Sequence, residues 1–497
     1  MNPRPQNIFR KLVGSCFTVF TISAFLSTST FGFDTGHHFD VTGKVLAENG
    51  FGDDAVRIAQ VENWLTDYYS NSPTYREKKR EVLELLHFDN LYDRRQVVSY
   101  WRQHLSNLKA ATEKAAKDND ELQMLVVLGI GLHSVQDFYS HSNWVETHPR
   151  RNDGSYRTDT ILGTQNGLSD LATSLYTGRY PADRTVGPDD RPVPANAANH
   201  GDYETGLNKD SPIRKGWDQA LVFAYCASHE IVNAIAGWAE KTRPGLWKRV
   251  QEFKTLEDAD KLDHDIRAAR NMSMWFKGEG QDGHWKGDKS GTARFFSAFS
   301  SGWVSKDSSR YVRALRDGTV PESLAKDLYS GKPVPNPGKI FAYSLNRRVV
   351  LIHTSLVKQV KGSNILRDTL SSTGGSDFYS VTKIWKQRYD GWVIQKARES
   401  IDPWTEIVFV DAAETNIPIN FSVWDEDGLR LTDDRQIDIN PKSGKLDLDM
   451  ILRTDNSLTG DIVGIFDHPA RELGISGAKP DKDRALVRVY VSQYLMK

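Results

Sequence analysis

Three residues with metal-binding side chains follow one another at intervals of four: His133, Asp137 and His141. On a helix, this spacing places all three side chains on one face. Imidazole and carboxylate hold zinc in hydrolytic sites, and one carboxylate can bridge two metal ions about 3.5 to 4 Å apart. The spacing predicts a metal site with Asp137 as the bridge. The alternative is a polar helix face with a chance pair of histidines.

Other residues of the same kinds lie in similar helical contexts earlier in the chain: His38, Asp67 and His87. His229 lies in an Ala-rich helical stretch, which favours a packed side chain over a ligand. We expect surface positions for a further set of histidines: His37, His104, His148 and His284.

The elements that must position these residues are helical. From about 38 to 245 the pattern is that of helices, with apolar residues at spacings of three and four over 95–116 and 121–135. Between 147 and 211 the composition turns to Gly, Pro, Asn and Asp, which indicates a long surface segment between helices. We interpret most of it as an inert loop, with a lid or substrate rim as the alternative.

After Pro333, Pro335 and Pro337 the sequence pattern changes to alternating β-branched and polar residues with clusters of turn formers. The strongest strand patterns are 349–354, 406–410 and 417–424. We expect a mainly α multi-helix domain followed by an all-β antiparallel sandwich. The predicted boundaries are a signal peptide at 1–32, a helical domain at 33–245, a helical extension with a Pro-rich linker at 246–340, and the sandwich at 341–497.

Composition and the first residues indicate an exported protein. Residues 1–32 combine a basic start, an apolar stretch and a run of small residues, so we expect cleavage near Phe33. A lipoprotein box around Cys16 is the less favoured alternative, because the apolar stretch follows that cysteine. Removal of Cys16 would leave Cys226 alone, without a partner for a disulfide. No later run approaches about 18 consecutive apolar residues, so we predict a secreted or periplasmic location without a permanent membrane anchor.

The charge balance gives no reason to expect nucleic acid as a partner. The 497-residue chain has 64 Lys and Arg against 65 Asp and Glu, and so lacks the overall positive charge that draws proteins onto nucleic acid. No protein partner is evident either.

The segments around His38, Asp67 and His87, together with 131–144, resemble the zinc-dependent phospholipase C family and especially its HET-C-like branch. The resemblance covers roughly residues 33–240. It implies a helical domain with two or three zinc ions that hydrolyses phosphodiester bonds.

The resemblance also implies ligand sets. One zinc would be held by Asp67, His87, His133 and Asp137. A second would be held by Asp137, His38 and the freed amino group of Phe33.

The third zinc is where the sequence departs from the family. The family places a zinc histidine six residues after the bridging aspartate, where this chain has Asn143, and His141 is only four residues away. The family's later His-x3-Glu pair corresponds to His200 and Glu204, so we assign the third ion to His141, His200 and Glu204.

The resemblance suggests a catalytic role for one carboxylate. Zinc lowers the pKa of a bound water and neutralises the oxygens of a phosphodiester. A carboxylate beside zinc stays ionised and can accept the proton of that water. We therefore expect Asp67 to act as the catalytic base.

The carboxy-terminal part is similar to C2-like membrane-binding sandwiches, whose Asp-rich loops bind calcium. The candidate calcium ligands are Asp377, Asp425, Asp427 and Asp433. An upstream aspartate expected in the first loop falls near Ser371, which departs from the pattern. The alternatives are ordinary turn-forming aspartates and a sandwich that serves stability or protein contacts.

Taken together, the sequence predicts a secreted zinc-dependent phospholipase C that docks peripherally on membrane phospholipids and releases diacylglycerol and a phosphorylated head group. One alternative is a single-strand nuclease or 3'-nucleotidase of the same fold. Another is a non-catalytic lipid-binding recognition protein.

Overall fold

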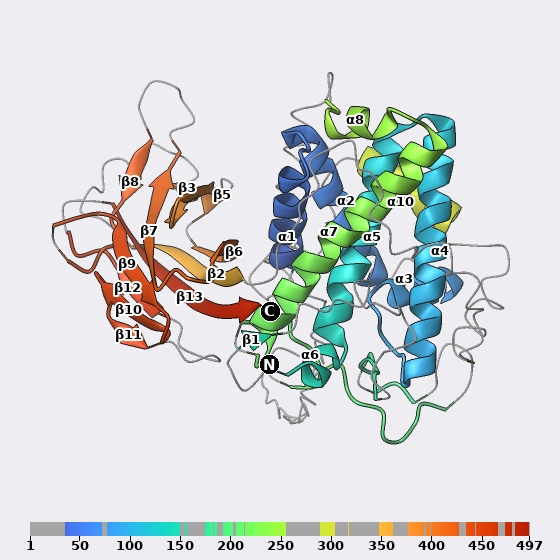
Figure 1. Ribbon diagram of the computed structural model, residues 1–497, viewed down its shortest axis with the longest axis horizontal. Helices are drawn as coiled ribbons and strands as arrows, with labels where there is room; N and C mark the ends of the chain where they lie inside the picture. Colours follow the sequence, from blue (N-terminus) through green and yellow to red (C-terminus); the bar gives the residue numbers. More distant parts are fainter. Residues whose placement is uncertain are drawn as a thin grey trace, which may run out of the picture.

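The computed structural model shows a helical part followed along the chain by a β part (Figure 1). It describes residues 35–71, 77–149, 155–156, 174–181, 183–185, 192–201, 205–212, 214–254, 289–303, 317, 347–360, 376–391, 394–397, 399–426, 434–442, 444–465, 473–479 and 483–496. The predicted order of a helical domain and then an antiparallel β domain is confirmed.

The helical part is built mainly from long helices. Its described helices are α1 (Thr35–Glu48), α2 (Asp53–Asn71), α3 (Glu77–Leu86), α4 (Arg94–Asp118), α5 (Glu121–His141), α6 (Trp144–Thr147), α7 (Trp217–Thr242), α8 (Leu246–Gln251) and α10 (Lys289–Gly302). The helices predicted at 95–116 and 121–135 are confirmed as α4 and α5. Helices α8 and α10 lie within the span assigned to the helical extension.

Helix α5 is the centre of this part, because every residue from Met124 to His141 is buried. It contacts α2, α4, α7, α8 and α10. The Asp120 side chain caps its first turn by accepting a hydrogen bond from the backbone N–H of Gln123. At Gly129 a Cβ atom would lie 2.6 Å from the carbonyl oxygen of Ala59, so a side chain there would push α2 away. The glycine thus lets α2 and α5 approach closely.

Helix α7 is long and apolar enough to cross a membrane, and 83% of its most apolar 18-residue stretch is buried inside the molecule. The neighbours that cover it are α1, α4, α5, α6 and α8. It also carries Cys226, which is buried. The burial identifies α7 as a core helix of the bundle.

The β part consists of two sheets. The first has the order β1 (Ser155–Tyr156), β13 (Arg484–Met496), β2 (Arg347–Val360) and β6 (Glu399–Asp411), with β12 (Leu473–Ser476) also paired to β13. The second has the order β11 (Gly464–Ile465), β10 (Ser457–Gly460), β9 (Leu448–Arg453), β7 (Asn416–Asp425), β3 (Ser376–Ile384) and β4 (Gln387–Asp390), with β5 (Ile394–Ala397) on β3 and β8 (Arg435–Ile437) on β7.

The three strands predicted from alternation, at 349–354, 406–410 and 417–424, are confirmed as parts of β2, β6 and β7. The pairings between the named strands are antiparallel except the short one between β1 and β13. Strand β1 comes from the long segment after α6, which sequence patterns did not assign to a sheet.

The two faces of β2 serve two different cores. Val350 and Ile352 point into the core between the sheets, whereas Val349 and Leu351 belong to the core of the helical part. Successive strand residues face opposite sides of a sheet, so alternation along one strand produces this division. The sheet of β2, β6 and β13 therefore packs directly against the helices, and Figure 1 shows α1 and α7 on that side.

Candidate metal centre

Five predicted ligands converge from four places in the helical part. They are His38 on α1, Asp67 on α2, His87 just after α3, and His133 and Asp137 on α5. Their ligand atoms form two overlapping groups in which all atoms lie within 4.8 Å of one another: His38 with His133 and Asp137, and Asp67 with His87 and His133. All are buried, with exposed fractions of 0 to 5%. We call these five residues the first cluster.

Asp137 lies at the middle of the first cluster. Its Oδ1 is 3.0 Å from Nε2 of His38, and its Oδ2 is 2.7 Å from Nδ1 of His87 and 2.9 Å from Nε2 of His133. One carboxylate oxygen thus faces one histidine and the other oxygen faces two. This is the arrangement needed for a carboxylate that bridges two ions.

Asp67 lies further than Asp137 from the same two imidazoles. Its Oδ1 is 3.7 Å from Nδ1 of His87 and 3.7 Å from Nε2 of His133. These separations exceed those of direct hydrogen bonds. They are compatible with a carboxylate and two imidazoles arranged around a shared ion.

Two amide side chains orient the histidines of the first cluster. Oε1 of Gln136 lies 2.7 Å from Nδ1 of His38, and Oδ1 of Asn63 lies 3.2 Å from Nδ1 of His133. An amide oxygen only accepts, so each histidine donates from Nδ1 and keeps the lone pair of Nε2 for the cluster. Asn63 also donates to Oε1 of Gln136, at 3.3 Å, which ties the two supports together.

The sequence places both supporting amides close to predicted ligands. Gln136 directly precedes the bridging aspartate, and Asn63 lies one helical turn before Asp67 on α2. Asn and Gln are not usual zinc ligands, so only the packing of α2 against α5 reveals the role of these two residues.

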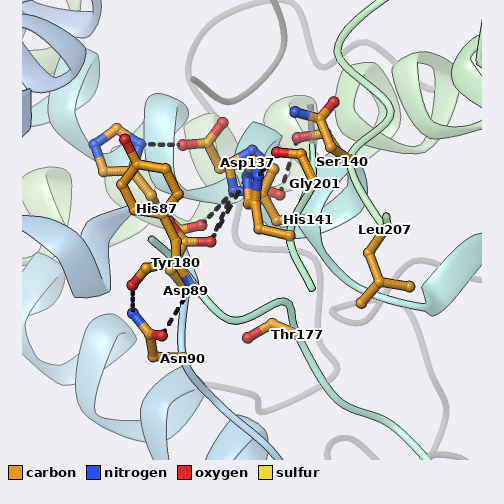
Figure 2. A network of polar contacts seen from close by, with 12 residues as sticks. His87, Asp89, Asn90, Asp137, Ser140, His141, Thr177, Tyr180, Gly201 and Leu207 are labelled. Carbon is orange, nitrogen blue, oxygen red and sulfur yellow. Dashed lines mark hydrogen bonds and ion pairs between the residues drawn. The ribbon is translucent and has the colours of Figure 1, made fainter. Parts of the chain in front are cut away.

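A second cluster lies at the carboxy-terminal end of α5. It groups His141 with His200, Asp89 and Asp210, and all four are buried. Nδ1 of His141 lies 3.5 Å from Oδ1 of Asp89, and its Nε2 lies 3.5 Å from Oδ1 of Asp210. Nε2 of His200 is 3.8 Å from Oδ1 of Asp89. Figure 2 shows His141 and Asp89 facing each other beside Asp137.

The predicted third ligand set is therefore partly changed. His141 and His200 lie together, with ring centroids 4.1 Å apart, as the assignment required. Glu204 lies outside the described residues. Asp89 and Asp210 supply the carboxylates that are seen here, and sequence reasoning missed both. Asp89 is two residues after His87, and this proximity was the available signal.

The described residues 177–180 of the long segment after α6 are hydrogen-bonded to the chain that follows α3. The backbone of Asn90 donates to the carbonyl of Gly178 at 2.8 Å, and the Asn90 side chain bonds both the N–H and the C=O of Tyr180 at 2.9 and 2.8 Å (Figure 2). The backbone N–H of Thr177 donates to the carbonyl of Leu91 at 2.7 Å, and Oγ1 of Thr177 accepts from the backbone N–H of Leu91 at 3.0 Å. The segment is thus joined to the chain that carries His87 and Asp89.

Gly178 is needed for this close approach. A Cβ atom at this position would lie 2.4 Å from Cα of His200 and 2.6 Å from its backbone nitrogen. The backbone nitrogen of Gly178 also donates to the carbonyl of His141 at 3.2 Å. The glycine therefore allows three separate segments to meet at the second cluster.

Burial keeps most of the imidazoles neutral, the form in which histidine binds metal. Desolvation lowers the pKa of His133 to about 3, that of His141 to about 4 and that of His200 to about 3. For His38, desolvation also acts to lower the pKa, but the charge of Asp137 outweighs it and the pKa is raised.

The carboxylates divide into two kinds. Burial acts to raise the pKa of Asp137, but His133, His141 and His38 lower it well below the usual value. In contrast, burial and neighbouring carboxylates raise the pKa of Asp89 well above the usual range, and burial raises that of Asp210 to about 8. A divalent cation would favour the ionised form of both groups.

Of the remaining predicted ligands, three lie outside the described residues: Phe33, Asp427 and Asp433. Asp377 and Asp425 lie side by side on β3 and β7, where Oδ1 of Asp425 accepts a hydrogen bond from the backbone N–H of Asp377 at 2.9 Å. Oδ2 of Asp425 pairs with Arg435 at 2.8 Å.

Two surface predictions are wrong, because His37 and His104 are both completely buried. His37 packs between the helical and β parts, and His104 packs among aromatic side chains. His148 is half-buried, and His284 lies outside the described residues. The prediction of a packed His229 is confirmed: it is buried and bonds Asn49 and Glu48.

Comparison with known proteins leaves the family open. A family profile described as the VWA7 N-terminal domain matches residues 77–161, a segment that contains His87, His133, Asp137 and His141 but far less than half of the chain. No curated protein sequence matches.

Solved structures match mainly over about a third of the chain. Human GIVD cytosolic phospholipase A2 is 10% identical over 30% of this chain, with a TM-score of 0.19, and the match spans 17% of that protein's length. A C2 domain of plant Extended Synaptotagmin 1 is 11% identical over 31% of this chain and 98% of its own, also with a TM-score of 0.19. We draw no functional conclusion from matches of this strength.

Proposed function

We propose that this protein is a zinc-dependent phosphodiesterase of the phospholipase C type that acts on membrane phospholipids. The observation that supports this most directly is the row of buried His133, Asp137 and His141 along one face of α5, joined by ligand-type residues from other elements. A polar helix face with chance histidines would not be completed by Asp67, His87 and Asp89 from other elements.

The donor set fits zinc. Nitrogen and carboxylate oxygen are its usual ligands in hydrolytic sites. Within the described part of the chain, Nε2 of His141 and Oδ1 of Asp89 are buried without a hydrogen-bond partner. A buried polar atom without a partner destabilises a fold, and coordination of a cation would satisfy these atoms.

The proposed ligand assignment follows the geometry. The first cluster would hold two ions that share Asp137, with Asp67, His87 and His133 on one side and His38 on the other. The second cluster would hold a third ion through His141, His200, Asp89 and Asp210. Bound zinc would lower the pKa of a coordinated water and neutralise the charge of a phosphodiester.

The protein's own residues would position the reactants. Asp67 would orient the attacking water and accept its proton, because its Oδ1 lies 3.7 Å from Nδ1 of His87 and 3.7 Å from Nε2 of His133, beyond direct hydrogen-bond distance. Gln136 and Asn63 would keep the Nε2 atoms of His38 and His133 directed at the centre. The segment that includes Thr177 and Tyr180 would form the rim of the site.

The β part would deliver the enzyme to its substrate. We propose that it is a C2-like sandwich that docks on the bilayer, with calcium bound by Asp377 and Asp425 at strand ends together with Asp427 and Asp433. Arg435 already neutralises one oxygen of Asp425, so calcium would have to displace that pair or bind the remaining carboxylates. Export of the protein and cleavage near Phe33 belong to the same proposal.

The decisive experiment measures zinc per chain together with hydrolysis of phosphatidylcholine, sphingomyelin and single-stranded DNA. Phospholipid hydrolysis at full zinc loading would support the proposal. Turnover of DNA alone would favour a nuclease, and no turnover at full loading would favour a non-catalytic lipid-binding protein.

The catalytic role of Asp67 has its own test. We expect Asp67→Asn to reduce turnover by about 100-fold or more, in the range of a lost general base. A variant that retains its zinc and turns over at the wild-type rate would exclude this role.

A further inference from the structure

Helix α1 carries a proposed metal ligand on one face and contacts the β part on the other. His38 points to Asp137 of the first cluster. The preceding residue, His37, points instead to Thr405 on β6. Two adjacent residues on one helical turn therefore connect the metal centre with the sheet.

The contact around His37 is a compact group of four buried residues, which we call the interdomain bracket: His37, Trp217, His353 and Thr405. Oγ1 of Thr405 lies 3.2 Å from Nδ1 of His37 and 2.9 Å from Nδ1 of His353. The rings of His37 and His353 have centroids 4.6 Å apart, and each lies 5.2 Å from Trp217. One threonine hydroxyl thus joins a helix residue to a strand residue.

The contact continues along α1 and α7. The Nζ atom of Lys44 lies 4.5 Å from the centroid of the Tyr389 ring, and the ring of Tyr225 stacks on Phe409 with centroids 5.4 Å apart. Ile407 of β6 is buried in the core of the helical part. These contacts are those of a shared core rather than of a loosely attached module.

His37 and His38 are neighbours on α1, so the backbone that places one imidazole ring also places the other. A metal ligand must be held to within about 0.5 Å of its productive position, and this requires support from outside the helix.

We propose that the interdomain bracket positions His38, so that the β part completes the metal centre of the helical part. Thr405 and His353 are positioning residues in this view, because they act through His37 and do not themselves face the first cluster. The inference rests on the proposed metal-dependent function. It extends that function by assigning the β part a role in metal binding in addition to contact with lipid.

The test compares zinc binding by full-length Thr405→Val and Thr405→Ser, measured by competition with a coloured chelator. Valine keeps the shape of threonine and removes the hydroxyl that bonds His37, whereas serine keeps that hydroxyl. We expect Thr405→Val to weaken one zinc ion by about 10-fold, the lower end of the range for outer-shell partners of a metal ligand. The other ions and the Thr405→Ser variant should match the wild type.

Thr112→Val is a matched control, because Thr112 is also buried and its hydroxyl donates to the carbonyl of Leu108 at 2.8 Å within α4. It should leave every zinc affinity unchanged. His353→Phe, which keeps a ring but removes the bond to Thr405, should weaken the same ion as Thr405→Val and provides a second route if the valine variant does not fold.

Unchanged zinc affinities in folded Thr405→Val or His353→Phe protein would overturn the inference and leave the proposed function standing. Wild-type protein that binds no zinc would overturn the proposed function itself.

Discussion

Substitution of the bridging carboxylate should have the largest effect on the metal centre. In Asp137→Asn, an amide replaces the group whose two oxygens lie 2.7 to 3.0 Å from His38, His87 and His133. The amide loses the negative charge and directs an N–H₂ donor at nitrogens needed for coordination. We therefore expect both ions of the first cluster to bind more weakly.

The size of the effect can be worked out from binding linkage. Loss of an outer-shell partner weakens metal binding by about 10-fold to 100-fold, so loss of a direct ligand shared by two ions should cost at least about 100-fold. At zinc concentrations about 1,000 times the wild-type dissociation constant, one zinc ion stabilises the folded state by about 4.1 kcal/mol. A 100-fold weaker site would stabilise it by only about 1.4 kcal/mol.

The difference of about 2.7 kcal/mol per ion corresponds to about 5 to 10 °C in the melting temperature of a domain of this size. The assay is thermal unfolding with and without zinc, with bound zinc measured by elemental analysis. We expect Asp137→Asn to lose most of the zinc-dependent rise in melting temperature.

Asp438→Asn provides a matched control. Asp438 is also completely buried, but it lies in the β part, where it accepts hydrogen bonds from the backbone of Asn440 and Lys479. This variant should lower the melting temperature yet keep the full zinc-dependent rise. An Asp137→Asn protein with wild-type zinc content and the same rise would refute the assignment of Asp137 as the bridge.

Further variants test the second cluster and the buried histidines. Asp210→Asn should lower bound zinc by one ion per chain, and an unchanged zinc content would exclude this ligand. Gly178→Ala should destabilise the fold by about 1 to 3 kcal/mol through the clash with His200, whereas Gly444→Ala, where a Cβ meets nothing within 4 Å, should be neutral in urea unfolding. Burial lowers the pKa of His104 to about 3. As the pH drops below about 6.5, this histidine is therefore protonated in the unfolded state but not in the folded state, and the free energy of unfolding falls. Between pH 7 and pH 5, the wild type should lose about 2 kcal/mol more unfolding free energy than His104→Phe. Equal losses for the two proteins in urea unfolding would contradict this.

Much of the candidate site could be predicted from local pattern. The spacing of His133, Asp137 and His141 sets one helix face, because the helical repeat alone determines which side chains align. His38, Asp67 and His87 were recognised by residue type, and the structure places them at that face. Alternation likewise predicted the strands that became β2, β6 and β7.

The tertiary structure alone decided which residues complete the centre. Asp89 and Asp210 come to His141 through contacts between segments far apart in the sequence: the backbone N–H of Asn90 donates to Gly178, and that of Lys209 donates to Ser140. No local periodicity encodes such contacts. Asn63 and Gln136 became supports through the packing of α2 on α5.

The surface position expected for His37 was wrong for the same reason, because local sequence patterns do not encode distant contacts. A histidine next to a ligand on an amphipathic helix reads as exposed when the helix is considered alone. Its burial comes from β6, where Thr405 lies 368 residues further along the chain and 3.2 Å from its Nδ1 atom. The sequence by itself thus determined the helix face, the strands and the ligand types. The packing of helix on sheet decided how that face is completed and held, because burial depends on partners that local residue patterns do not contain.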